Sequence, residues 1–122
     1  MPSILTPALL GLIEQSGTAI ATLIEGLAQD ELLRSRLTRA EVLRQLRILA
    51  GSAAQVPAAA RDEMPELDWA GWDAMRARFE EPPGDSLDEA LWFACESLVP
   101  ATLLWLRVYR QGQPALFRMS AS

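Results

Sequence analysis

Apolar residues recur every three or four positions along most of this chain, and this spacing constrains the fold more than any other feature. Such a spacing places apolar side chains on one face of an α-helix. No segment shows the alternation of apolar and polar residues that is typical of a β-strand. The first helix is expected to run for about 22 residues from Thr6 and Pro7, a capping hydroxyl followed by a proline that fits the first turn. Its stripe consists of Leu9, Leu12, Ile13, Ile20, Leu23, Ile24 and Leu27.

Two further helix starts are predicted from capping boxes, in which two side chains each bond the other's backbone N–H. Thr38 and Glu41 form the first box and predict a second long helix that ends before Pro57. Ser86 begins the second box and predicts a last helix, with a kink at Pro100 because proline lacks a backbone N–H. Short helical pieces are expected in the connections before and after the second long helix.

Another main helix is predicted to begin after Asp68, which serves as its cap, and to end before the Glu-Pro-Pro-Gly run at 81–84. Its apolar positions fit a core stripe better than a base-stacking surface: Trp69, Trp72, Met75 and Phe79.

Together these patterns predict an all-α fold, an antiparallel up-and-down four-helix bundle with a short extra helix. A chain of 122 residues is close to the commonest size of one domain, so a single domain is expected over 1–122. The bundle is expected over 6–111. The tail at 112–122 is predicted to be poorly ordered.

Composition excludes several kinds of site. The chain has no histidine and a single cysteine, Cys95, so Cys-His pairs, Ser-His-Asp triads and structural zinc sites are ruled out. No metal or cofactor is expected. All eleven basic residues are arginine and the net charge is -5, which disfavours non-specific binding to long nucleic acids. The arginine clusters fit solvated helix faces with local ion pairs: Arg34, Arg36, Arg39, Arg44 and Arg47, then Arg107, Arg110 and Arg118.

Two expectations concern surroundings and partners. No apolar run reaches about 20 uninterrupted residues, and no basic residue precedes the N-terminal apolar run. A cytoplasmic protein with no membrane span is therefore expected. The last helix carries more apolar residues than one buried stripe can hold, which predicts a homodimer. The candidate interface residues are Trp92, Leu103 and Trp105.

Three sequence blocks carry a family resemblance over about residues 38–106: AEVLRQLRILAGSAAQVP, PELDWAGWDAMR and ALWFACESLVP. With the Met75-Arg76 pair, and Trp92 eight residues before Pro100, they resemble the HepT-like proteins of the HEPN superfamily. The resemblance implies an all-helical dimer, commonly encoded beside a minimal nucleotidyltransferase in a toxin-antitoxin pair. It also implies ribonuclease activity that depends on an arginine and a histidine.

The chain departs from the family where that chemistry would lie. Glu81 occupies the histidine position and Pro83 the position of the tyrosine that accepts a nucleotide in the family, a role that Tyr109 in another block does not inherit. A glutamate with an ordinary pKa is ionised at neutral pH and cannot donate a proton. Arg76 and Arg78 remain candidates for binding a nucleotide or RNA phosphate. A plain surface ion-pair group, with Arg76 and Glu80 at i,i+4 spacing, is the alternative.

The leading functional prediction is therefore a non-catalytic HepT-like dimeric binding module. It would serve a minimal nucleotidyltransferase as partner, or regulate an active relative in a toxin-antitoxin type system. One alternative is a divergent HEPN ribonuclease toxin that uses Arg76 and Glu81. Another is a stand-alone nucleotide-binding domain.

Overall fold

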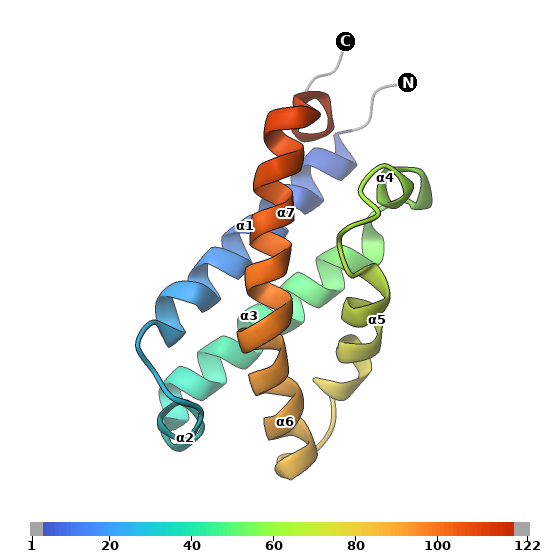
Figure 1. Ribbon diagram of the computed structural model, residues 1–122. Coiled ribbons are helices and arrows are strands. Elements are labelled where there is room, and N and C mark those ends of the chain that lie inside the picture. Colours follow the sequence, from blue (N-terminus) through green and yellow to red (C-terminus); the bar gives the residue numbers. More distant parts are fainter. Residues whose placement is uncertain (1–3, 119–122) are drawn as a thin grey trace.

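The computed structural model describes residues 4–118, and every regular element in this part of the chain is helical. The predicted all-α bundle is confirmed. Successive long helices run in alternating directions (Figure 1). They are α1 (Leu5–Ile24), α3 (Arg36–Gln55), α5 (Trp69–Arg78) and a last helix made of α6 (Asp85–Phe93), the π-helical turn η1 (Ala94–Leu98) and α7 (Val99–Gly112).

Shorter elements connect or extend the long helices. The pieces expected on either side of α3 are present as α2 (Gln29–Arg34) and α4 (Ala58–Asp62), and a 3₁₀ turn, η2 (Pro114–Phe117), follows α7. Two chain features stop the first two long helices. Gly26 follows α1 with a φ of 76°, a left-handed conformation that glycine adopts without strain. Val56 precedes Pro57 and is extended, which ends α3 as predicted.

The predicted helix starts are only partly correct. Asp68 caps α5 as predicted, because its side chain accepts a hydrogen bond of 2.8 Å from the Gly71 N–H. Thr6, Thr38 and Ser86 do not cap, because α1, α3 and α6 begin one or two residues before them and place them inside the first turn. The predicted starts therefore lie within two residues of the observed ones, but no side chain caps α1, α3 or α6.

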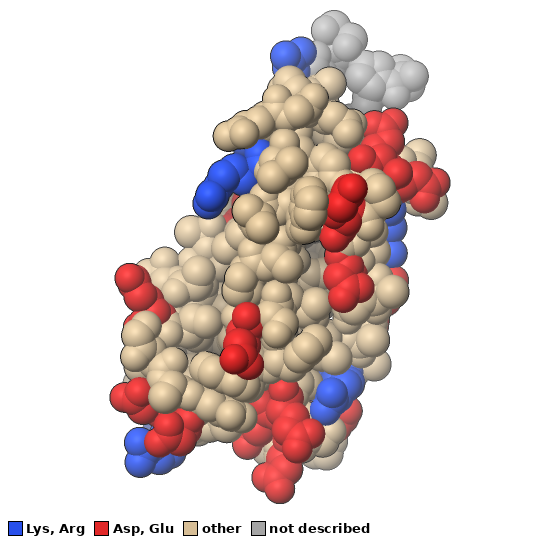
Figure 2. Space-filling model, viewed as in Figure 1, with Lys and Arg blue, Asp and Glu red and all other residues tan. Residues whose placement is uncertain are grey.

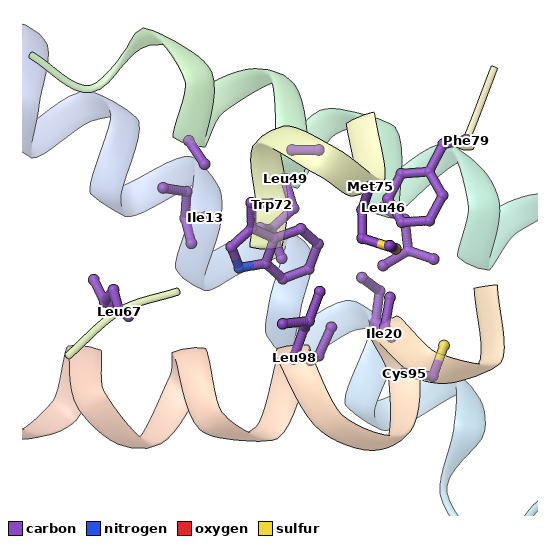
Figure 3. Packing of buried hydrophobic residues seen from close by; sticks show 14 of the residues in the cluster. Ile13, Ile20, Leu46, Leu49, Leu67, Trp72, Met75, Phe79, Cys95 and Leu98 are labelled. Carbon is purple, nitrogen blue, oxygen red and sulfur yellow. The ribbon is translucent and has the colours of Figure 1, made fainter. Parts of the chain in front are cut away.

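One cluster of buried side chains lies between the helices, with α3 packed against both α1 and α5, and α7 against α1. Trp72 lies near its centre, close to Ile13 of α1, Leu49 of α3 and Leu98 of η1 (Figure 3). The Trp72 indole Nε1 donates a hydrogen bond of 2.9 Å to Thr102 Oγ1. The aromatic stripe of α5 therefore forms core, as predicted, with Trp69 at its edge.

The irregularity expected at Pro100 takes the form of the π-helical turn η1, which directly precedes it. In a regular α-helix the proline ring would collide with the carbonyl of Glu96 and leave it without a donor. The wider turn relieves this conflict. The helix continues to Gly112, and Leu103 packs closely on α1, where a Cβ at Gly17 would lie 2.9 Å from Leu103 Cδ2.

The expectation of a poorly ordered tail is wrong for the residues up to Arg118. η2 packs against both α1 and α7. The Arg110 guanidinium lies 4.5 Å from the centre of the Phe117 ring, so an aromatic contact and a cation hold this turn in place. Residues 119–122 lie outside the described part of the chain.

Two helical segments, Leu5–Ile24 and Asp85–Gly112, are long and apolar enough to cross a membrane by length and composition alone. Both contribute buried residues to the core, as the helices of a water-soluble bundle also do. This finding is weak evidence about a membrane in either direction.

Candidate functional site

The orientation of α5 determines which of its side chains reach the surface. Trp72, Met75 and Phe79 are buried against the other helices. At 3.6 residues per turn, this leaves the intervening positions on the outward face. Arg76 is therefore exposed, on the same side of the helix as Asp73.

Arg76 lines an open hollow of about 280 Å³ together with Asp73, Ala77 and Glu80. Its guanidinium makes no hydrogen bond or ion pair with any residue in the described part of the chain. The predicted i,i+4 ion pair between Arg76 and Glu80 is not formed.

The two carboxylates of this hollow already have partners on neighbouring elements. Arg61 of α4 pairs with Asp73 at 3.0 Å. This hydrogen bond lowers the pKa of the Asp73 carboxyl, against a smaller opposing effect of desolvation, and the charge of Arg76 adds to the lowering. Arg47 of α3 pairs with Glu80 at 3.3 Å and also donates to the Phe79 carbonyl oxygen at 2.8 Å. Arg76 is thus the charge that remains unneutralised at the hollow.

Arg78 and Glu81 face each other and not Arg76. The Arg78 Nε lies 3.6 Å from Glu81 Oε1, and its Nη2 donates to the Ser86 carbonyl oxygen at 2.7 Å. These contacts tie the loop that follows α5 to the start of α6. Arg78, a predicted phosphate ligand, is therefore already engaged, and no contact joins Glu81 to Arg76.

The chemistry that this arrangement supports is binding. Histidine is absent, and burial raises the pKa of the Cys95 thiol to about 12, so this cysteine is inert at neutral pH. In residues 4–118 no group of acidic, histidine or cysteine side chains could hold a metal ion. Arg76 can attract an anionic group, and the two carboxylates beside it, Asp73 and Glu80, are each held in an ion pair with another arginine.

Sequence reasoning missed the roles of Arg47 and Arg61. Local pairs at helical spacing were expected, and three are present within residues 4–118: Arg34 with Asp30, Arg44 with Glu41 and Arg78 with Glu81. The pairs made by Arg47 and Arg61 instead join different helices, as does that of Arg39 with Asp88. Their spacing along the chain carries no signal of these contacts.

A second candidate surface lies on the outward side of the last helix. We call it the α6–α7 strip; its residues are exposed and uncharged: Phe93, Ser97, Pro100, Ala101, Leu104 and Val108. Figure 2, viewed with α7 in front, shows a face that is mostly uncharged, with acidic groups both within it and around its margins.

The residues predicted from the sequence for a dimer interface border this strip. Trp92, Leu103 and Trp105 are only partly buried and pack against the core. Val99 of the last helix is a core residue. The large side chains that remain exposed on this side are Phe93, Leu104 and Val108.

No family model, curated protein or solved structure matches this chain.

Proposed function

We propose that this protein is a non-catalytic, HepT-like dimeric binding module whose α6–α7 strip docks another protein. The partner is a minimal nucleotidyltransferase, or an active relative that this chain regulates in a toxin-antitoxin type system. The single observation that carries the proposal is the strip itself.

The strip has the character of a docking surface. Phe93, Leu104 and Val108 are 47%, 52% and 44% exposed, although each is large and apolar. Single exposed apolar residues are ordinary, but several of them along one helix face form a candidate interaction site. The residues of the strip itself are uncharged, and the exposed charges of Glu96, between Phe93 and Pro100, and Arg107, between Leu104 and Val108, lie beside them.

The ion pairs around α5 support a non-catalytic role. Cleavage of RNA needs a group that takes the proton from a ribose hydroxyl and a group that returns one to the leaving oxygen. Glu81, at the family's histidine position, faces Arg78. Arg76, which has no ion-pair partner within residues 4–118, can stabilise negative charge but cannot move a proton.

The test is co-expression with the product of the neighbouring gene. The wild-type chain is expected to co-purify with that product, and Leu104→Glu is expected to abolish the complex by placing a charge in the strip. Leu37→Glu is the matched control, since Leu37 is 79% exposed at the start of α3, outside the strip. Equal loss in both variants, or no loss in either, contradicts the proposed surface.

Catalysis is tested on the purified chain. No RNA cleavage above background is expected. Cleavage that disappears in both Arg76→Ala and Glu81→Ala would overturn the non-catalytic assignment and establish the divergent ribonuclease instead.

The hollow at Arg76 favours a second candidate, binding of a nucleotide phosphate. Its carboxylates are neutralised by Arg47 and Arg61, so the local balance is one positive charge. ATP at about a hundred times its dissociation constant would stabilise the folded state by about 2.7 kcal/mol. The expected outcome is a rise in melting temperature that is lost in Arg76→Ala and kept in Arg107→Ala, a control with an exposed arginine on α7.

A further inference from the structure

The outward face of α1 has an unusual composition for a surface helix. Its exposed and half-exposed positions include a set with the three- and four-residue spacing of a helix–helix seam. Six of them, all uncharged, follow this spacing along one side of the helix: Leu5, Ala8, Leu12, Gln15, Ala19 and Thr22. We call this set the α1 seam. Glu14 is the helix's single charged residue, and it already pairs with Arg110 of α7.

A groove opens beside this seam. It has a volume of about 340 Å³, and Arg110 and Phe117 form its far wall. On α1 its floor includes four residues at positions i, i+3, i+4 and i+7, which is the set that forms a hole for a knob from a facing helix: Ala8, Gly11, Leu12 and Gln15.

Gly11 lies in this floor and is not explained by packing within residues 4–118. A glycine inside a helix makes the helix less stable than an alanine would. A compensating contact is therefore expected where a helix contains a glycine. Gly17 has one, because Leu103 fills the space where its Cβ would lie. A Cβ at Gly11 would meet nothing within 4 Å.

Open space above a helical glycine does not by itself indicate a contact with another molecule. Gly51 of α3 has the same property, but it follows Arg44 and Arg47 at the spacing of one helix face, away from the groove on α1. Gly11 differs because it lies in a hollow on an uncharged seam. This contrast makes Gly51 a matched control.

We infer that the occupant of the groove is α1 of a second copy of this chain, related by a two-fold axis that passes near Leu12. The same helix supplies both parts of the contact: Leu12, 43% exposed, as the knob, and the groove as the hole. A two-fold contact requires this self-complementarity.

Charge also favours a second copy. The chain carries a net charge of -5, so most pairings of its surfaces bring like charges together. The α1 seam is an exception, because its only nearby carboxylate is neutralised within each copy. A helix of 20 residues is about 30 Å long, which gives an interface at the small end of specific contacts.

This inference deepens the proposed function, on which it rests for the dimer itself. It places the contact between copies on α1, whereas the sequence expectation placed it on the last helix. The α6–α7 strip is thereby left free for the heterologous partner.

The experiment is sedimentation velocity of the full chain over a series of micromolar concentrations. The wild type is expected to dimerise, and Leu12→Glu and Gly11→Gln are each expected to weaken association at least about tenfold. Gly51→Gln and Leu104→Glu should dimerise as the wild type does. Because glutamine favours helix more than glycine, Gly11→Gln should keep or raise the melting temperature, which separates loss of association from unfolding.

Three outcomes overturn the inference. The first is a wild-type chain that stays monomeric throughout the concentration series. The second is a dimer that is lost in Leu104→Glu and kept in Leu12→Glu, which would assign the contact to the α6–α7 strip. The third is a monomer that floats with neutral phosphatidylcholine vesicles and loses this binding in Leu12→Glu, which would make the α1 seam a membrane-facing surface. Partner co-purification by the Leu12→Glu variant tests the strip separately.

Discussion

Among single residues, Thr102 has the most sharply defined stabilising role, because its hydroxyl is the acceptor for the buried indole of Trp72. Thr102→Val keeps the shape and leaves the indole N–H without a partner, so we expect the free energy of unfolding to fall by about 1 to 3 kcal/mol. Urea denaturation followed by tryptophan fluorescence measures this. Thr18→Val, at an exposed site on α1, should change stability little. An equal effect of the two changes would contradict the assigned role.

Asp73 gives the molecule a pH-dependent contribution. Its pKa is lowered in the folded protein, chiefly by the hydrogen bond from Arg61, so the folded state binds fewer protons than the unfolded chain. The contribution is present above the unfolded pKa of about 3.9 and disappears as the pH falls through the folded value. Asp73→Asn should therefore destabilise by at most about 1 kcal/mol at neutral pH, since the pair is partly exposed.

Urea denaturation of Asp73→Asn and the wild type at neutral pH and at about pH 3 checks this prediction. The difference between the two proteins should shrink in acid. Asp62→Asn, which removes a nearby carboxylate that makes no ion pair within residues 4–118, is the control. A difference that stays constant with pH would show that Asp73 acts through something other than its charge.

The role of a residue could be predicted where it depends only on neighbours in the sequence. The burial of Trp72 and Phe79 follows from their spacing, and the absence of histidine limits the chemistry whatever the fold. The partners of Arg47 and Arg61 did not follow, because a long flexible guanidinium pairs with whatever carboxylate the packing of other helices brings near. Whether Arg76 is free depends on those distant pairs.

On the scale of elements, the helix starts make a clear contrast. Asp68 caps α5 with its side chain, so Asp68→Ala should destabilise by about 1 kcal/mol. Thr38 lies inside α3, where alanine is the better helix former, so Thr38→Ala should be neutral or slightly stabilising. Thermal denaturation of the two variants tests this contrast. A larger loss for Thr38→Ala would restore the capping box predicted from the sequence.

The regions of the helices were predictable from their apolar stripes, and their ends less so. Prolines give firm ends, as Pro57 does, because they remove a donor and restrict the residue before them. Hydroxyl residues predict the first residue of a helix less accurately. Packing can begin the helix one residue before them, as it does before Thr6 and Ser86.

At the scale of the whole molecule, the C-terminal turn is part of the fold. Phe117 is half-buried and stacks with Arg110, whose other contact is Glu14 on α1. We expect Phe117→Ala to lower the free energy of unfolding by about 1 kcal/mol, less than the roughly 3 to 5 kcal/mol typical of a fully buried phenylalanine. Chemical denaturation measures the loss, and Phe93→Ala, at an exposed position of the strip, is the control. No loss for Phe117→Ala would mean that η2 contributes nothing to stability.

The bundle as a whole could be predicted because several amphipathic helices with short connections bury their stripes most simply in this way. From the sequence, only the segment that contains the candidate site could be predicted, and not the residues that surround it. Its hollow is lined by α5, but its charge balance is set by α3 and α4, three elements separated in sequence. The docked tail was missed because its few apolar residues, Leu116 and Phe117, gain burial only against helices already assembled.

The π-helical turn before Pro100 acts as a register shift within the last helix. A turn of this kind holds about one residue more than a regular α-helical turn, and one residue corresponds to a rotation of roughly 100°. The face that α7 presents is therefore offset from the one that α6 alone would specify. Deleting Ser97 would remove this offset and turn Leu104 and Val108 away from Phe93. The continuity of the apolar surface thus depends on the one extra residue that this turn holds. A deletion changes that number of residues, whereas a substitution does not.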